Sequence, residues 1–316
     1  MLLIILTFFS DYFPGESVEP NNHYINNVVF SNLKTTVRGA AVSLVNLENS
    51  KIVIESSVFY YCWATGSSIV GGAVAIQNTN NCPVVTAKVC AAYCRTDTGD
   101  GDGTTLRGQF CYIETGKTDI NNAFFLSVTK CAYITNNGRD PIRLQQGVQI
   151  IKNCNSSLNT VAFYSGALFS TQSSANSSYC TISNNIGKSM CFGIWNSALS
   201  YHVFNNIICN NSPNGYGIIH SVSCNSFFEM CVFSLNQNKL FCCYSGSMLV
   251  KYCFIDTISY TYTSPSMVSN SGKTSSFLLK HFNSHACPAD HPYQDTSYLI
   301  RRIGPNYLVL GLFYIL

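Results

Sequence analysis

Charged residues are scarce in this chain. Asp, Glu, Lys and Arg make up 10% of its 316 residues, against about 25% in an average soluble protein. Coiled coils and other long helical proteins are rich in Glu, Lys and Arg, so the composition argues against them. The net charge of +3 is small and no basic run occurs, so nothing indicates a nucleic-acid partner. Hydrophobic residues at 47% exclude a disordered chain.

Long apolar runs are also lacking. No stretch of about 20 apolar residues occurs, which excludes a polytopic membrane protein. Residues 1–15 begin with the run MLLIILTFFS, which we interpret as a short signal peptide or as a first buried strand. The apolar tail at 306–316 is about half of a membrane span, so membrane attachment and a docked tail are both open.

Catalytic patterns are missing as well. Glu229 is the only acidic residue between Asp140 and Asp256, whereas glycoside hydrolysis needs two carboxylates beside the bond. No G-x-S-x-G elbow for acyl transfer occurs. The sequence C-x-x-C, typical of zinc ribbons and thioredoxin-like sites, is also absent. We therefore expect a protein without enzymatic activity.

An imperfect repeat of about 25 residues is present instead. The form C-x-Φ-x-x-N, in which Φ is apolar, begins at Cys131, Cys180 and Cys231 and ends at Asn136, Asn185 and Asn236, and Asn211 closes a related copy. Residues two apart in a strand face the same side, so we expect the Cys and the apolar residue to point inward. The Asn would end the strand at a corner, because Asn tolerates a left-handed backbone and its amide stacks in ladders.

This period predicts an all-β fold, namely a right-handed parallel β-helix (a solenoid) of roughly ten coils over residues 22–284. A polar loop would be inserted at 95–109, and residues 285–316 would form an irregular cap followed by the apolar tail. The alternative is an antiparallel β-sandwich, which would need hairpin turns. Asn-Gly, the strongest hairpin signal, occurs only at Asn137-Gly138 and Asn214-Gly215, so the solenoid is favoured.

Three tetrapeptides carry a family resemblance. GGAV at Gly71, SGAL at Ser165 and FSLN at Phe233 resemble the GGA[ILV] and FxxN repeats of chlamydial polymorphic membrane proteins. The low charge and the Asn, Ser and Cys content are similar to those of trichomonad surface proteins with the same fold. The resemblance implies a pectate-lyase-like β-helix with a signal peptide, a membrane anchor and a role in adhesion.

Two clusters are candidates for metal binding. Asp97, Asp100 and Asp102 lie in a glycine-rich segment, and their carboxylates are suited to calcium. The second cluster is suited to zinc through imidazole and thiolate, and consists of His281, His285, Cys287 and His291. The aspartate cluster can also be interpreted as part of a solvated loop, and the histidine and cysteine cluster as part of a cap over the last coil.

The cysteines and three asparagines are candidates for covalent modification. Sixteen Cys is an even number, and Cys94 and Cys111, which flank the polar loop, are candidates for a disulfide. Cys at inward ladder positions would instead behave as small buried hydrophobes. N-x-[ST] sequences that permit glycosylation occur at Asn155, Asn176 and Asn210.

Together these features predict an extracellular or cell-surface β-helix that presents a binding face to a host cell surface, a matrix or a glycan. One alternative is a carbohydrate-active β-helix, a lyase or hydrolase that uses the loop from Asp97 to Asp102. Another is a structural coat component that polymerises through exposed coil edges.

Overall fold

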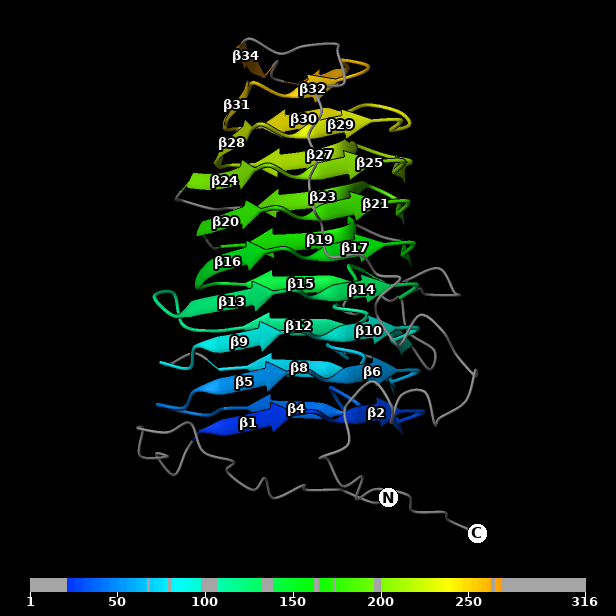
Figure 1. The fold of residues 1–316 in the computed structure, drawn as a ribbon, viewed down its shortest axis with the longest axis vertical. Coiled ribbons are helices and arrows are strands. Elements are labelled where there is room, and N and C mark those ends of the chain that lie inside the picture. Colours follow the sequence, from blue (N-terminus) through cyan, green and yellow to red (C-terminus); the bar gives the residue numbers. More distant parts are fainter. Residues whose placement is uncertain are drawn as a thin grey trace.

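The computed structural model describes residues 22–66, 69–78, 81–97, 107–131, 139–161, 165–172, 174–195, 200–262 and 265–268. These residues form a stack of coils that contains strands and no helix. Strands from successive coils lie above one another along the long axis (Figure 1), and their pairings are parallel. This arrangement confirms the all-β parallel β-helix and excludes the alternative, an antiparallel β-sandwich.

Three long sheets form the sides of the stack. Sheet I has ten strands, in spatial order β1 (His23–Asn26), β5 (Ile52–Glu55), β9 (Val84–Ala87), β13 (Ile120–Phe124), β16 (Val148–Lys152), β20 (Ser174–Ser178), β24 (Ser200–Phe204), β28 (Asn225–Glu229), β31 (Ser247–Lys251) and β34 (Ser266–Val268). Sheet II has nine strands, β2 (Val29–Ser31), β6 (Val58–Tyr60), β10 (Cys90–Ala92), β14 (Ser127–Thr129), β17 (Asn155–Ser157), β21 (Thr181–Ser183), β25 (Ile207–Cys209), β29 (Val232–Ser234) and β32 (Phe254–Ile255).

Sheet III also has nine strands, β4 (Val42–Val45), β8 (Val74–Gln77), β12 (Cys111–Glu114), β15 (Ile142–Gln145), β19 (Ser165–Thr171), β23 (Met190–Trp195), β27 (Gly217–Val222), β30 (Phe241–Tyr244) and β33 (Tyr260–Tyr262). Two short sheets lie between sheets II and III in the chain. They are β3 (Lys34–Thr35), β7 (Trp63–Thr65) and β11 (Arg95–Asp97), and then β18 (Thr160–Val161), β22 (Ile186–Gly187) and β26 (Ser212–Pro213). Each coil thus contributes a strand to sheet I, then to sheet II, then to sheet III.

The coil length varies along the stack. Ile52 pairs with Val84, which lies 32 positions later, whereas Val148 pairs with Ser174, only 26 positions later. In sheet I the ten strands span about 43 Å, since adjacent strands lie about 4.8 Å apart. The 25-residue period therefore holds in the second half of the stack, and the first half has longer coils.

A single apolar core fills the interior. Strand alternation directs every second side chain inward, as in β5, where Ile52 and Ile54 are buried. Equivalent side chains then stack from coil to coil, so that Phe30 lies over Phe59 with ring centroids 5.0 Å apart. Phe59 in turn contacts Phe110, which immediately precedes β12 of sheet III. The core is thus built from ladders of like residues.

The two corners of sheet II are two-residue turns. The first residue of each turn has a positive φ in coil after coil, as at Asn184 with φ 56° and Asn210 with φ 55°. Bulky residues take the same conformation in other coils, for example Tyr179 and Leu235. An L-residue in this conformation costs roughly 1–2 kcal/mol, so the stacking of the coils imposes it.

At the corner after sheet II, the second residue in the later coils is an Asn, which is buried at Asn159, Asn185 and Asn211 and half-buried at Asn236. Its side-chain Oδ1 accepts from the backbone N–H and the Nδ2 of the equivalent Asn one coil earlier. The Nδ2–Oδ1 distances are 3.0, 3.1 and 3.2 Å along the ladder of Asn159, Asn185, Asn211 and Asn236. Each Nδ2 also donates to a main-chain carbonyl, as Asn185 does to Ser156 O at 2.8 Å. The amide ladder expected for Asn185, Asn211 and Asn236 is therefore present.

The structure corrects two details of this ladder. The left-handed backbone and the stacked amide belong to neighbouring residues, such as Asn184 and Asn185, and not to one Asn. Asn159 extends the ladder, although the residue three positions before it is Ser156 and not an apolar residue. Asn136 lies outside the described residues.

The cysteines of the repeat point inward, but in two different corners. Cys180 and Cys231 lie in the turn before sheet II, whereas Cys131 lies in the turn after it, above Cys94. All three are buried, as expected. The alignment of Cys131 with the other two copies was wrong, because longer coils shift the motif by one corner.

The described strands run from His23 to Val268, within the interval 22–284 expected for the β-helix. The segments 1–15 and 285–316 and most of the loop 95–109 lie outside the described residues. Among the residues that are described, no helix is long and apolar enough to cross a membrane.

Candidate binding face on sheet III

The outer surface of sheet III carries a column of polar and aromatic side chains. In β12, Cys111 and Ile113 belong to the core, so Tyr112 and Glu114 point outward. The register of the sheet connects equivalent outward positions from coil to coil. One such column contains Gln77, Glu114, Gln145, Trp195 and Tyr244. We call this column, together with Tyr112 and Tyr216, the sheet III face.

Hydrogen bonds organise the polar part of the sheet III face. Glu114 lies between two amides: Gln77 Nε2 donates to its Oε2 at 3.0 Å, and Gln145 Nε2 donates to its Oε1 at 2.8 Å. The Tyr112 hydroxyl lies 2.9 Å from Glu114 Oε2 and 3.1 Å from Gln145 Oε1. Burial, and then the nearby Glu114 carboxylate, raise the pKa of Tyr112 to about 12. The hydroxyl therefore stays protonated at neutral pH and acts as a donor.

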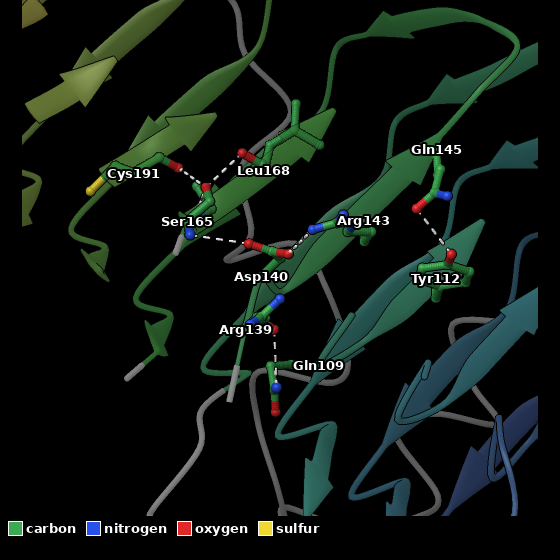
Figure 2. A network of polar contacts seen from close by, with 10 residues as sticks. Gln109, Tyr112, Arg139, Asp140, Arg143, Gln145, Ser165, Leu168 and Cys191 are labelled. Atoms are coloured by element: carbon green, nitrogen blue, oxygen red, sulfur yellow. Dashed lines mark hydrogen bonds and ion pairs between the residues drawn. The ribbon is translucent and has the colours of Figure 1, made fainter. Parts of the chain in front are cut away.

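A buried ion pair lies next to this group, in the coil that follows Tyr112. Arg143 Nη1 is 3.1 Å from Asp140 Oδ2, and the Ser165 N–H donates to Asp140 Oδ1 at 3.0 Å, as Figure 2 shows. Asp140 is fully buried, and burial raises its pKa while Arg143 opposes that shift. The Ser165 hydroxyl lies within hydrogen-bond distance of the carbonyls of Leu168 and Cys191, on its own coil and the next. This network joins successive coils of sheet III.

The arrangement does not suit hydrolysis. Glu114 accepts hydrogen bonds from three side chains. Asp140 has no exposed surface with which to meet a substrate. General acid–base catalysis needs a group within hydrogen-bond reach of the substrate, and Asp140 is enclosed. Both carboxylates are thus engaged in contacts within sheet III.

Aromatic rings continue the face in the later coils. The Tyr216 and His220 rings stack with centroids 4.5 Å apart, and Trp195 meets His220 edge-on at 5.9 Å. Burial lowers the pKa of His220 to about 4, so its ring is neutral at pH 7. Tyr216 and Tyr244 are 44% and 53% exposed. Exposed rings beside amide and carboxylate groups can bind ligands that have both apolar and hydroxyl surfaces.

The metal-site predictions fall largely outside the described residues. Asp97 ends strand β11, whereas Asp100 and Asp102 lie outside the described residues. The zinc candidates His281, His285, Cys287 and His291 also lie outside them. Within the part of the chain that the structure describes, no group of three or more potential ligands converges.

The predicted covalent sites differ in exposure. Asn176 and Asn210 are exposed, whereas Asn155 is only 5% exposed, which leaves no room for a glycan on its amide. Cys94 and Cys111 are both buried free thiols, so the expected disulfide between them is not made. Cys94 belongs to a turn beside sheet II, and Cys111 begins β12 of sheet III, so the two face the core from different sides.

Sequence reasoning missed the residues of the sheet III face. Gln77, Glu114 and Gln145 are separated by 37 and 31 positions, and no constant period relates them. An outward polar residue near the end of successive sheet III strands was the available signal. No protein-family model, no curated protein and no solved structure matches the chain.

Proposed function

We propose that the protein is a non-enzymatic, secreted or surface-displayed β-helix that binds a host cell surface, a matrix or a glycan through the sheet III face. The observation that carries this proposal is the outward column of sheet III that contains Gln77, Glu114, Gln145, Trp195 and Tyr244. Its polar part offers half-buried amide and carboxylate groups, and its later part offers exposed aromatic rings.

Two further considerations support it. The repeats at Gly71, Ser165 and Phe233 resemble those of polymorphic membrane proteins, for which adhesion is proposed. A solenoid also presents an extended face that a long ligand can follow from coil to coil. The short apolar ends at 1–15 and 306–316 are the proposed signal and attachment segments.

The test is a panel of immobilised glycans, matrix proteins and cells, together with soluble polysaccharides checked for cleavage. We expect the purified chain to bind a member of the panel without cleaving any polysaccharide. Tyr244→Ala should weaken binding, whereas Tyr252→Ala, a matched exposed tyrosine at a corner of sheet II, should not. Cleavage of a polysaccharide with no binding to any surface would contradict the proposal.

A further inference from the structure

Cysteines stack in pairs on neighbouring coils at the turn from sheet I to sheet II. Cys154 and Cys180 precede β17 and β21, which pair in register. Cys231 and Cys253 precede β29 and β32 in the same way. Adjacent parallel strands lie about 4.8 Å apart, and disulfides join Cα atoms about 4.4–6.8 Å apart. Both pairs therefore meet the distance requirement for a disulfide without backbone movement.

Backbone contacts bring the sulfurs toward each other. The Cys154 N–H donates to Cys180 Sγ at 3.4 Å, and the Cys231 N–H donates to Cys253 Sγ at 3.3 Å. In each pair the later side chain thus reaches back to the earlier coil. A core cavity of about 40 Å³ is lined by both Cys154 and Cys180, which leaves space for the side chains to rotate.

The two thiols of a pair differ in acidity. Burial, and then contact with Cys180, raise the pKa of Cys154. Burial alone would raise the pKa of Cys180, but donation from the Cys154 thiol and N–H lowers it. Contact with Cys231 likewise lowers the pKa of Cys253, while the pKa of Cys231 is raised by burial and by that contact. The more acidic thiol of each pair is the better nucleophile, and the second thiol beside it can complete the disulfide.

We propose that these two pairs, Cys154–Cys180 and Cys231–Cys253, are sites of oxidative modification, at which hydrogen peroxide, an oxidant close to water in size, converts each buried pair into an inter-coil disulfide. In the first step the Cys180 sulfur attacks one oxygen of the peroxide, the O–O bond breaks, and the sulfenic acid of Cys180 and one water form. The Cys154 sulfur then attacks the sulfenic sulfur, its S–O bond breaks, and the Cys154–Cys180 bond and a second water form.

The oxidant and the cysteine pair together account for all atoms and electrons in this reaction, so no further reactant is needed. Two electrons pass from the pair to the peroxide, and the two protons lost by the thiols end in the two water molecules. The bond would join consecutive coils at a corner of sheet II. This modification goes beyond the proposed binding function and does not depend on it.

Two buried cysteines provide internal controls. Burial raises the pKa of Cys111 and of Cys191 to about 12, and no cysteine contact contributes to either shift. Both are as enclosed as the paired thiols. They should stay reduced if pairing, rather than burial or exposure to the oxidant, decides which cysteines react.

The experiment treats the folded full-length chain with hydrogen peroxide, then alkylates it under denaturing conditions and identifies linked peptides by mass spectrometry. We expect links between Cys154 and Cys180 and between Cys231 and Cys253, each with a loss of two hydrogens, while Cys111 stays alkylated. Cys180→Ser should leave Cys154 alkylated and the other pair linked. Where that variant fails to fold, Cys253→Ser makes the equivalent test. Full alkylation of both pairs, or links between cysteines of different pairs, would overturn the proposal.

Discussion

The asparagine ladder makes a quantitative prediction at Asn185. This side chain is fully buried and takes part in four hydrogen bonds between three coils. Asn185→Ala leaves the Asn159 N–H without its acceptor, and an unpaired buried donor costs about 1–3 kcal/mol. The two bonds that Asn185 Nδ2 donates add about 1 kcal/mol each. We therefore expect a loss of about 3–5 kcal/mol in the free energy of unfolding.

Urea unfolding, followed by circular dichroism, measures this loss from the shift in midpoint and slope. Asn176→Ala is the matched control, because Asn176 is an exposed residue of sheet I, where a substitution costs within about 0.5 kcal/mol. Asn185→Asp should be intermediate, since it keeps an acceptor and loses the donor. The reasoning is refuted if Asn185→Ala destabilises the protein no more than Asn176→Ala does.

Three further predictions concern single positions. Gly71→Ala should prevent stable folding, measured as loss of soluble protein, because φ is +68° and the new Cβ would lie 2.0 Å from Val74 O; normal yield would contradict this. Arg143→Met should cost about 3–5 kcal/mol in unfolding free energy by leaving Asp140 buried and unpaired, and adding Asp140→Asn should recover part of it. His220 has a pKa of about 4 in the fold and about 6.5 when unfolded. The free energy of unfolding is therefore unaffected by this ring above pH 6.5, and it decreases as pH falls from 6.5 toward 4, because the unfolded chain then binds a proton that the fold does not. His220→Phe should therefore reduce the loss of stability over that interval, by up to about 3 kcal/mol, and an unchanged pH profile would argue against a neutral buried ring.

The repeat was visible in the sequence where the coils are shortest. Cys180 to Asn185 and Cys231 to Asn236 are clean copies, because each contains one sheet II strand and both of its corners. Cys154 to Asn159 has the same structure, but Ser156 replaces the apolar residue, so the pattern does not reveal it. The stacked strands tolerate Ser in place of an apolar residue here, because the Ser156 hydroxyl donates to the Ala167 carbonyl of the same coil.

The earlier coils could not be aligned from the sequence. Longer connections between sheets change the spacing, so Cys131 occupies the corner after sheet II although its motif resembles that of Cys180. The sheet III face was hidden for the same reason. Its polar contacts join Gln77 to Glu114 and Glu114 to Gln145 across coils of different length. Only the pairing of the strands brings these side chains together.

The most direct test of the central claim is a binding isotherm on the surface that the panel identifies. The double variant Trp195→Ala/Tyr244→Ala removes two of the three aromatic side chains in the later coils of the sheet III face and leaves Tyr216, and Tyr252→Ala is its control. The account predicts at least about tenfold weaker binding for the double variant, which corresponds to about 1.4 kcal/mol, and an unchanged affinity for the control. Equal affinity of all three proteins, or equal weakening of both variants, would contradict the assignment of binding to this face.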